Sequence, residues 1–119
     1  MINDNFALTG ALTIAVNEEV VQETHNLVVT AGKNWVADRM ADANAVMSHM
    51  AIGTGTTAAA AGDTALGTQL DRNALTTSGG VVSGNTITYA STWAAGDGTG
   101  AVTEAGIFDA STGGDMLAR

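Results

Sequence analysis

The sequence predicts a mostly β fold: an antiparallel β-sandwich of jelly-roll type with one short α-helix. Apolar and polar residues alternate in several short stretches, as they do in strands that bury one face. Turn residues recur about every ten positions, the spacing typical of antiparallel sandwiches. The length of 119 residues suits one domain. We therefore expect a single domain over residues 1–119, in which residues 1–30 form an N-terminal hairpin or docking arm.

The N-terminal hairpin is predicted from two strands and a polar turn. In the first strand, Phe6–Val16, larger apolar side chains alternate with alanine and threonine. The polar run Asn17–Glu19 interrupts this pattern, and a second strand follows over Val20–Thr30, with Leu27 and Val29 on one face. Two such strands around a short turn favour an antiparallel pair.

One stretch, Ala31–Asn44, has the spacing of an α-helix. Thr30 is the predicted N-cap, because its hydroxyl can accept a hydrogen bond from a backbone N–H of the first turn. Asn44 is the predicted end. The residues expected at helical spacing on the packed face are Trp35, Val36, Arg39, Met40 and Ala43.

The rest of the chain is predicted as strands joined by glycine-rich turns and one long loop of small residues, Thr54–Gly67. Asn85–Ala95 is the clearest of these strands, with Ile87, Tyr89 and Trp93 on one face. The predicted strands are Ser48–Gly53, Leu70–Ser78, Asn85–Ala95, Ala101–Ala110 and a last one that starts at Met116. The large residues expected in the core include Phe6, Trp35, Tyr89, Trp93 and Phe108.

Composition argues against several classes of protein. The chain has no cysteine, which excludes disulfides, thiol nucleophiles and cysteine metal sites. Four Lys and Arg stand against twelve Asp and Glu, a formal charge of −8, so we expect no nucleic-acid partner. The uncharged stretch Phe6–Val16 is much shorter than the roughly 20 residues of a membrane span, so we expect no membrane partner.

Residues able to carry chemistry are few and fit no motif. His25 and His49 are the only histidines; His49 follows Ser48 directly, and no serine lies in a G-x-S-x-G elbow. The acids Asp97, Glu104, Asp109 and Asp115 offer oxygen ligands for calcium, but without EF-hand spacing. We interpret the histidines as ordinary strand residues and the acids as a solvated edge. No enzymatic activity, cofactor or bound metal is expected.

Three segments, in order, resemble small bacteriophage virion proteins. They are Asn26–Trp35 (NLVVTAGKNW), Met50–Leu70 (MAIGTGTTAAAAGDTALGTQL) with Arg72 just after, and Val102–Ala110 (VTEAGIFDA) followed by a glycine turn and Met116–Arg119. The order is similar to β-sandwich proteins found as capsid decoration proteins and as domains of tail fibres. This resemblance implies a virion structural protein, located on the capsid surface or in the tail.

The function that the resemblance implies first is capsid decoration, in which the chain binds and stabilises the major capsid shell as a cement protein. Its partners would be the major capsid protein or other virion proteins, and the chain would form a homo-oligomer, a dimer or a trimer. The docking surface is expected on two stretches of low charge, Met1–Leu12 and the loop Gly53–Gly67, and removal of that loop is expected to leave the fold intact. The expected partner-binding residues are Phe6, Leu8, Leu12, Gly53, Thr54, Gly55, Thr56, Thr57, Asp63 and Leu66.

Two further functions stay open at this point. The chain can be the attachment domain of a tail fibre or a tail adaptor, which differs from a decoration protein in copy number. It can also be a carbohydrate-binding receptor module, which requires a solvent-accessible Trp35 or Trp93 because sugars stack on exposed aromatic rings.

Overall fold

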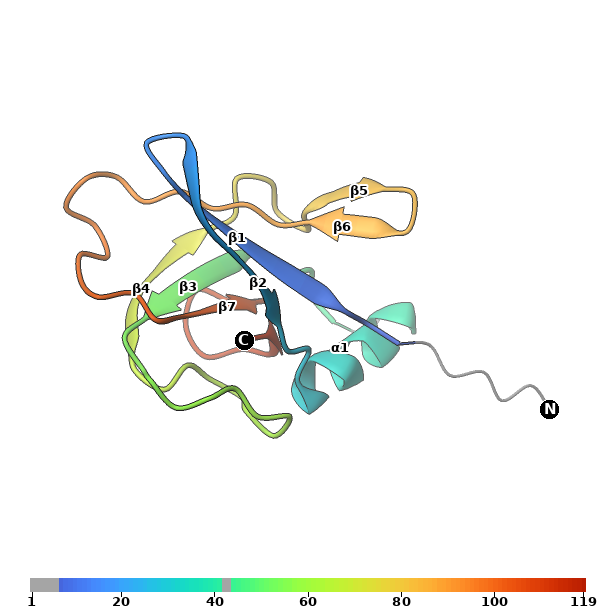
Figure 1. Cartoon of the computed structure of the whole chain (residues 1–119). Helices are drawn as coiled ribbons and strands as arrows, with labels where there is room; N and C mark the ends of the chain where they lie inside the picture. Colours follow the sequence, from blue (N-terminus) through green and yellow to red (C-terminus); the bar gives the residue numbers. More distant parts are fainter. Residues whose placement is uncertain (1–6, 42–43) are drawn as a thin grey trace.

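A four-stranded antiparallel sheet forms the centre of the molecule in the computed structural model, which describes residues 7–41 and 44–119 (Figure 1). Its strand order is β4-β3-β7-β8, so the two central strands come from distant parts of the chain. The strands are β3 (His49–Gly53), β4 (Gln69–Ala74), β7 (Glu104–Phe108) and β8 (Met116–Ala118).

The core lies on both faces of this sheet, because successive strand residues point to opposite sides. One cluster contains Ala51 and Phe108, together with Val29, Leu66 and Met116. The other contains Met50 and Ile107, the sequence neighbours of those two, packed with Trp35, Met47, Leu75 and Tyr89. Each face therefore needs its own cover from outside the sheet.

The helix α1 (Thr30–Met40) supplies part of that cover and packs against β8. Trp35 is buried in the second cluster, and its indole Nε1 donates a hydrogen bond to the Ala45 carbonyl at 2.9 Å. Gly32 is buried so close to β8 that a Cβ at this position would overlap the Leu117 carbonyl oxygen. A glycine in this helix is therefore required by the approach of two backbones.

Two separate hairpins complete the fold: β1 (Gly10–Val16) with β2 (Glu19–Asn26), and β5 (Val81–Ser83) with β6 (Thr86–Thr88). Asn17 and Glu18 form the first turn with positive φ angles of 51° and 66°, as a two-residue type I′ turn requires. Leu12 and Ile14 of β1 are half-buried and line a groove with Val102–Ala105, at the start of β7. The first hairpin thus lies across the sheet, as Figure 1 shows.

The predicted fold class is confirmed: the chain is mostly β, with antiparallel sheets and one helix in the described part. The N-terminal hairpin, the helix and strands at β3, β4, β7 and β8 all lie where the sequence places them, with shorter bounds. The jelly-roll order of a sandwich stays a prediction, because the sheets other than the central one are two-stranded hairpins.

Predictions at the helix and before it were wrong in detail. Thr30 lies inside α1, and the N-cap is Val29, which makes no side-chain capping bond. The helix ends at Met40 and not at Asn44; Ala43 lies outside the described residues. Leu27 and Val29 do not share a buried face, because Val29 is buried in the core and Leu27 stays exposed.

The predicted strand Asn85–Ala95 was also wrong over most of its length. Only Thr86–Thr88 is a strand, paired with β5. The following segment runs along the free edge of β4, where the Asn73 side-chain amide donates to the Thr92 carbonyl (2.9 Å) and the Ser91 hydroxyl donates to the Ala74 carbonyl (3.0 Å). These side-chain hydrogen bonds hold the segment against β4 in place of a regular backbone ladder. The segment is therefore not a strand, although its sequence alternates.

We expect Gly32→Ala to destabilise the protein by about 2 kcal/mol, the cost typical of forcing an extra carbon into a packed contact. In an exposed helix, the same change would stabilise by up to about 1 kcal/mol, so the sign of the effect tests the packing of α1 on β8. Urea denaturation measures the free energy of unfolding. Gly62→Ala is the control, because a Cβ at position 62 meets open space. Equal stability of the two variants would contradict the prediction.

Candidate functional site

The Glu104 carboxylate, at the start of β7, is the centre of the most connected polar site. Its Oε1 accepts hydrogen bonds from the backbone N–H groups of Gly55 (2.8 Å) and Thr68 (2.7 Å). Its Oε2 accepts one from the N–H of Gly67 (2.8 Å) and two from the Arg119 guanidinium (2.9 and 3.2 Å). Only 4% of this side chain is exposed, so a charged group is buried with its acceptor sites occupied.

Arg119 extends the site from Glu104 to the loop. Its guanidinium is 6% exposed and pairs with the carboxylates of both Glu104 and Asp63. It also donates to the Thr57 carbonyl at 2.9 Å, while Asp63 accepts a further bond from the Ala60 N–H. We call Glu104, Asp63 and Arg119 the Glu104 cluster. It binds both ends and the middle of the loop that joins β3 to β4.

The glycines of this loop are explained by the same carboxylate. A Cβ at Gly53 would lie 2.6 Å from Glu104 Oε1, and a Cβ at Gly55 would overlap the same oxygen. The Gly-Thr-Gly sequence therefore allows the backbone to approach the carboxylate closely enough to donate to it. The close approach of the backbone to Glu104 explains this spacing of glycines.

The electrostatics of the cluster favour its charged forms. Burial alone would raise the pKa of Glu104, but the N–H groups of Thr68, Gly67 and Gly55 and the Arg119 guanidinium together lower it below its ordinary value. The pKa of Asp63 is lowered by the Ala60 N–H and by Arg119. The pKa of Arg119 is raised, chiefly by its bond to Asp63. The ion pairs thus persist at neutral pH.

Arg72 of β4 forms a second anchor across the sheet. Its guanidinium carbon lies 3.6 Å from the centroid of the Phe108 ring, a cation–π contact. The same guanidinium donates to the carbonyls of Ala110 (3.0 Å) and Gly113 (2.9 Å), in the turn between β7 and β8. Arg72 therefore positions this turn over the first core cluster.

The structure places the predicted docking residues in different environments. In the long loop, Gly53 and Leu66 are buried, while Gly55 and Asp63 bind the Glu104 cluster. Thr54 is half-buried, and Thr56 and Thr57 have exposed side chains. Leu8 and Leu12 are half-buried, and Phe6 lies outside the described residues. A docking role for these residues stays a prediction.

The loop Gly53–Gly67 is not a separable surface element. Its removal would take away two of the three N–H donors to Glu104, the Asp63 partner of Arg119 and the buried side chain of Leu66. These contacts argue against the expectation that the fold survives this deletion, which stays a prediction. A run of small residues suggests a loop that makes few contacts, but here the small side chains allow the loop backbone to approach Glu104 closely.

The other chemical candidates lie apart from one another. Ser48 Oγ and His49 Nδ1 are 2.8 Å apart, but no carboxylate in residues 7–41 and 44–119 hydrogen-bonds to His49. Asp109 accepts a bond from the Asp115 backbone N–H at 2.7 Å and so closes a turn. Across the described ranges, no three acidic or histidine side chains gather as metal ligands.

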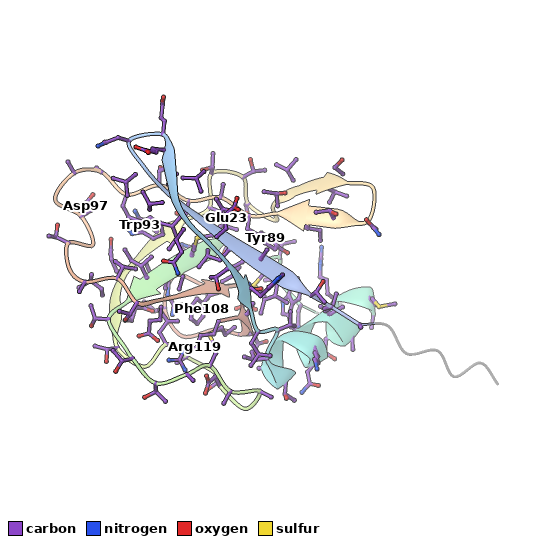
Figure 2. All side chains as sticks on the ribbon, viewed as in Figure 1. Glu23, Tyr89, Trp93, Asp97, Phe108 and Arg119 are labelled. Carbon is purple, nitrogen blue, oxygen red and sulfur yellow. The ribbon has the colours of Figure 1, made fainter. Side chains whose placement is uncertain are left out.

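The two tryptophans differ in environment. Trp35 belongs to the second core cluster. Trp93 is half-buried, near Asp97 at the end of the molecule away from α1 (Figure 2), and its buried indole Nε1 has no hydrogen-bond partner among the described residues. A sugar-stacking surface would therefore depend on Trp93 alone.

Sequence reasoning missed two hairpins on which several exposed apolar side chains lie close together. At the turn end of the first hairpin, Val16, Val20 and Val21 are each more than half exposed. On the second hairpin, Val81, Val82 and Ile87 are at least half exposed. Alternating patterns predicted β1, β2 and the position of β6, but neither β5 nor the lack of a covering layer over these hairpins.

Comparisons of the chain with protein-family models, curated proteins and solved structures return no match. In the part of the chain that the structure describes, no helix combines the length and the apolar character that crossing a membrane requires.

We expect Glu104→Gln to lower the free energy of unfolding by about 3 kcal/mol, the cost typical of breaking a buried ion pair from one side. The amide would bring N–H donors toward a site already occupied by N–H donors. Urea denaturation at neutral pH measures the effect. Glu23→Gln, at an exposed position of β2, is the matched control and should change stability little. Similar stabilities for the two variants would argue against the cluster as a structural anchor.

The lowered pKa of Glu104 also predicts a pH dependence of stability. A carboxyl with a lower pKa in the folded state contributes its full stability above its unfolded pKa, about 4.3 for glutamate, and loses it as pH falls through the folded value. Urea midpoints from about pH 7 to about pH 3 should therefore fall more steeply for the wild type than for Glu104→Gln. Parallel curves would show that Glu104 titrates alike in both states.

Proposed function

We propose that this chain is a bacteriophage virion structural protein, in particular a capsid decoration protein that binds and stabilises the major capsid shell. The observation that carries the proposal is the β1–β2 hairpin, which presents exposed valines on an element that is only loosely attached to the body of the protein. In this proposal, the biochemical role of the protein is adhesion to other polypeptides, without bond-making chemistry.

The first hairpin has the properties of a docking arm. An isolated two-stranded hairpin is marginal in water, and apart from β2, β1 makes few close contacts with other strands or with the helix. Val16, Val20 and Val21 lie together around its turn, beside Glu18 and Glu19. A partner that buries these valines and offers cationic groups to the two carboxylates would stabilise the hairpin, and the same contacts would hold the complex together. A polypeptide surface with an apolar groove and a Lys or Arg rim fits both requirements.

The resemblance to phage proteins gains physical support from the Glu104 cluster. Gly55, Asp63 and Gly67 belong to the second resembling segment, Glu104 to the third, and Arg119 to the terminal Met-Leu-Ala-Arg. The residues on which the resemblance rests thus form one interaction network. A shared network explains why these separated segments would occur together in a family of related domains.

A decoration protein of this kind stabilises a shell by mass action. Any protein that binds the assembled shell better than its separated subunits shifts the equilibrium toward the shell. Bound at contacts between neighbouring subunits, many copies together would resist the pressure of packaged DNA. The chain would then be located on the capsid surface.

The test is the composition of virions produced by the genome that carries this chain. Mass spectrometry and electron microscopy of purified particles should find it in hundreds of copies on the capsid. About a dozen copies at the tail would instead assign it to the tail fibre or tail adaptor class. Its absence from particles would overturn the proposal.

We expect the triple variant Val16→Thr, Val20→Thr, Val21→Thr to bind shells about 100-fold more weakly, because each change removes about 1 kcal/mol of apolar burial. Threonine keeps the β-branched shape, so the hairpin itself should persist. Binding is measured by co-sedimentation with shells that lack the protein. Leu70→Thr, at an exposed position of β4, is the control. Equal binding by all three proteins would remove the hairpin from the docking surface.

A further inference from the structure

We propose that the β5–β6 hairpin is a self-association surface, on which Val82 and Ile87 pack against the same hairpin of a second copy of this chain. The inference concerns the purified protein and does not depend on the proposed virion function. It uses a different hairpin from the one assigned to the docking arm.

The molecule exposes more surface than a monomer of its size normally does. Its accessible surface is 7695 Å² for 11.9 kDa, whereas the usual scaling gives about 6,000 Å². The difference is about 1,700 Å². A standard protein–protein interface covers about 800 Å² on each partner. The excess is therefore large enough for one such interface.

Val82 and Ile87 form one apolar surface on the second hairpin. Val82 and Ile87 are cross-strand partners, so their side chains lie next to each other on the same face. Val82 is 67% exposed and Ile87 is 50% exposed. Strands of three residues do not make a stable hairpin alone, so burial against another surface would stabilise this element.

This surface continues the second core cluster outward. Ile87 and Tyr89 are two residues apart and both lie within 2.8 Å of the place that a Cβ of Gly80 would occupy. Tyr89 packs against the cluster of Trp35, Met47 and Leu75. The apolar face therefore begins inside the protein and ends in solvent, and Figure 1 shows β5 and β6 extending beyond the central sheet.

Charge identifies the occupant as another copy of the chain. The molecule carries a formal charge of −8, so two copies repel each other over most of their surfaces. Residues 73–96, which include the whole second hairpin, contain no Asp, Glu, Lys or Arg. By contrast, the first hairpin carries Glu18, Glu19 and Glu23. Two like-charged copies can thus approach at the second hairpin with least repulsion, and a two-fold axis would place the same patch on both sides.

The test is sedimentation velocity of the purified chain over about 1 to 100 µM, the range in which a micromolar dimer dissociates. The wild type should form dimers. Val82→Glu places a negative charge on both sides of the contact and should weaken the dimer at least 100-fold. The matched control Val20→Glu makes the same change at an exposed valine of the first hairpin and should leave the dimer unchanged. Circular dichroism and urea midpoints establish that each variant folds.

A mixing experiment gives a second readout that does not depend on loss of assembly. Val82→Lys alone should also be monomeric, whereas an equal mixture of Val82→Lys and Val82→Glu should regain the dimer, because opposite charges then meet across the contact. If the wild type forms a trimer and Val82→Glu dissociates it, the self-association surface is supported, and the contact has three-fold instead of two-fold symmetry. A monomeric wild type, or an oligomer that Val82→Glu leaves intact, would overturn the proposal. Neither result would affect shell binding by the first hairpin.

Discussion

The buried carboxylate of Glu104 is the constraint on which the loop between β3 and β4 depends. This loop has little regular structure, so its backbone N–H groups need an acceptor other than a neighbouring strand. Glu104 accepts from three of them, and Arg119 balances its charge. Neither charge would be stable in the interior alone, since burying an unpaired ion is costly. Residues 55, 67, 104 and 119 therefore depend on one another although they are far apart in the sequence.

This arrangement also limits which surfaces are available for binding. The loop of small residues resembles a docking surface in the sequence, but its buried Leu66 side chain and its Asp63 carboxylate already bind the protein's own body. Two groups of exposed apolar residues lie instead on the β1–β2 and β5–β6 hairpins. One hairpin carries carboxylates and suits a partner of opposite charge, whereas the other is uncharged and suits a second copy of the chain. Separate surfaces would allow self-association and adhesion at the same time.

The predictions failed where tertiary contacts replaced local rules. Asn85–Ala95 alternates like a strand, yet beyond Thr88 it is bound to β4 through Asn73 and Ser91 side chains. Thr30 has the chemistry of an N-cap, but the helix begins at Thr30, one residue earlier than predicted, and its N-cap is Val29, which is buried in the core. The Glu104 cluster could not be predicted, because no spacing in a single sequence indicates that positions 63, 104 and 119 meet. Its one local signal was the pair of glycines at 53 and 55.

Local physics by itself determined the class of fold. Alternating side chains, glycine turns and one stretch of helical spacing specify a mostly β chain with one helix, because each depends on residues within a few positions of each other. The absence of cysteine from the sequence likewise excludes disulfides and thiol chemistry. Only the tertiary structure decided which strands pair, which carboxylate is buried and which valines stay uncovered. Those properties depend on contacts between distant segments, and such contacts produce no periodic pattern in the sequence.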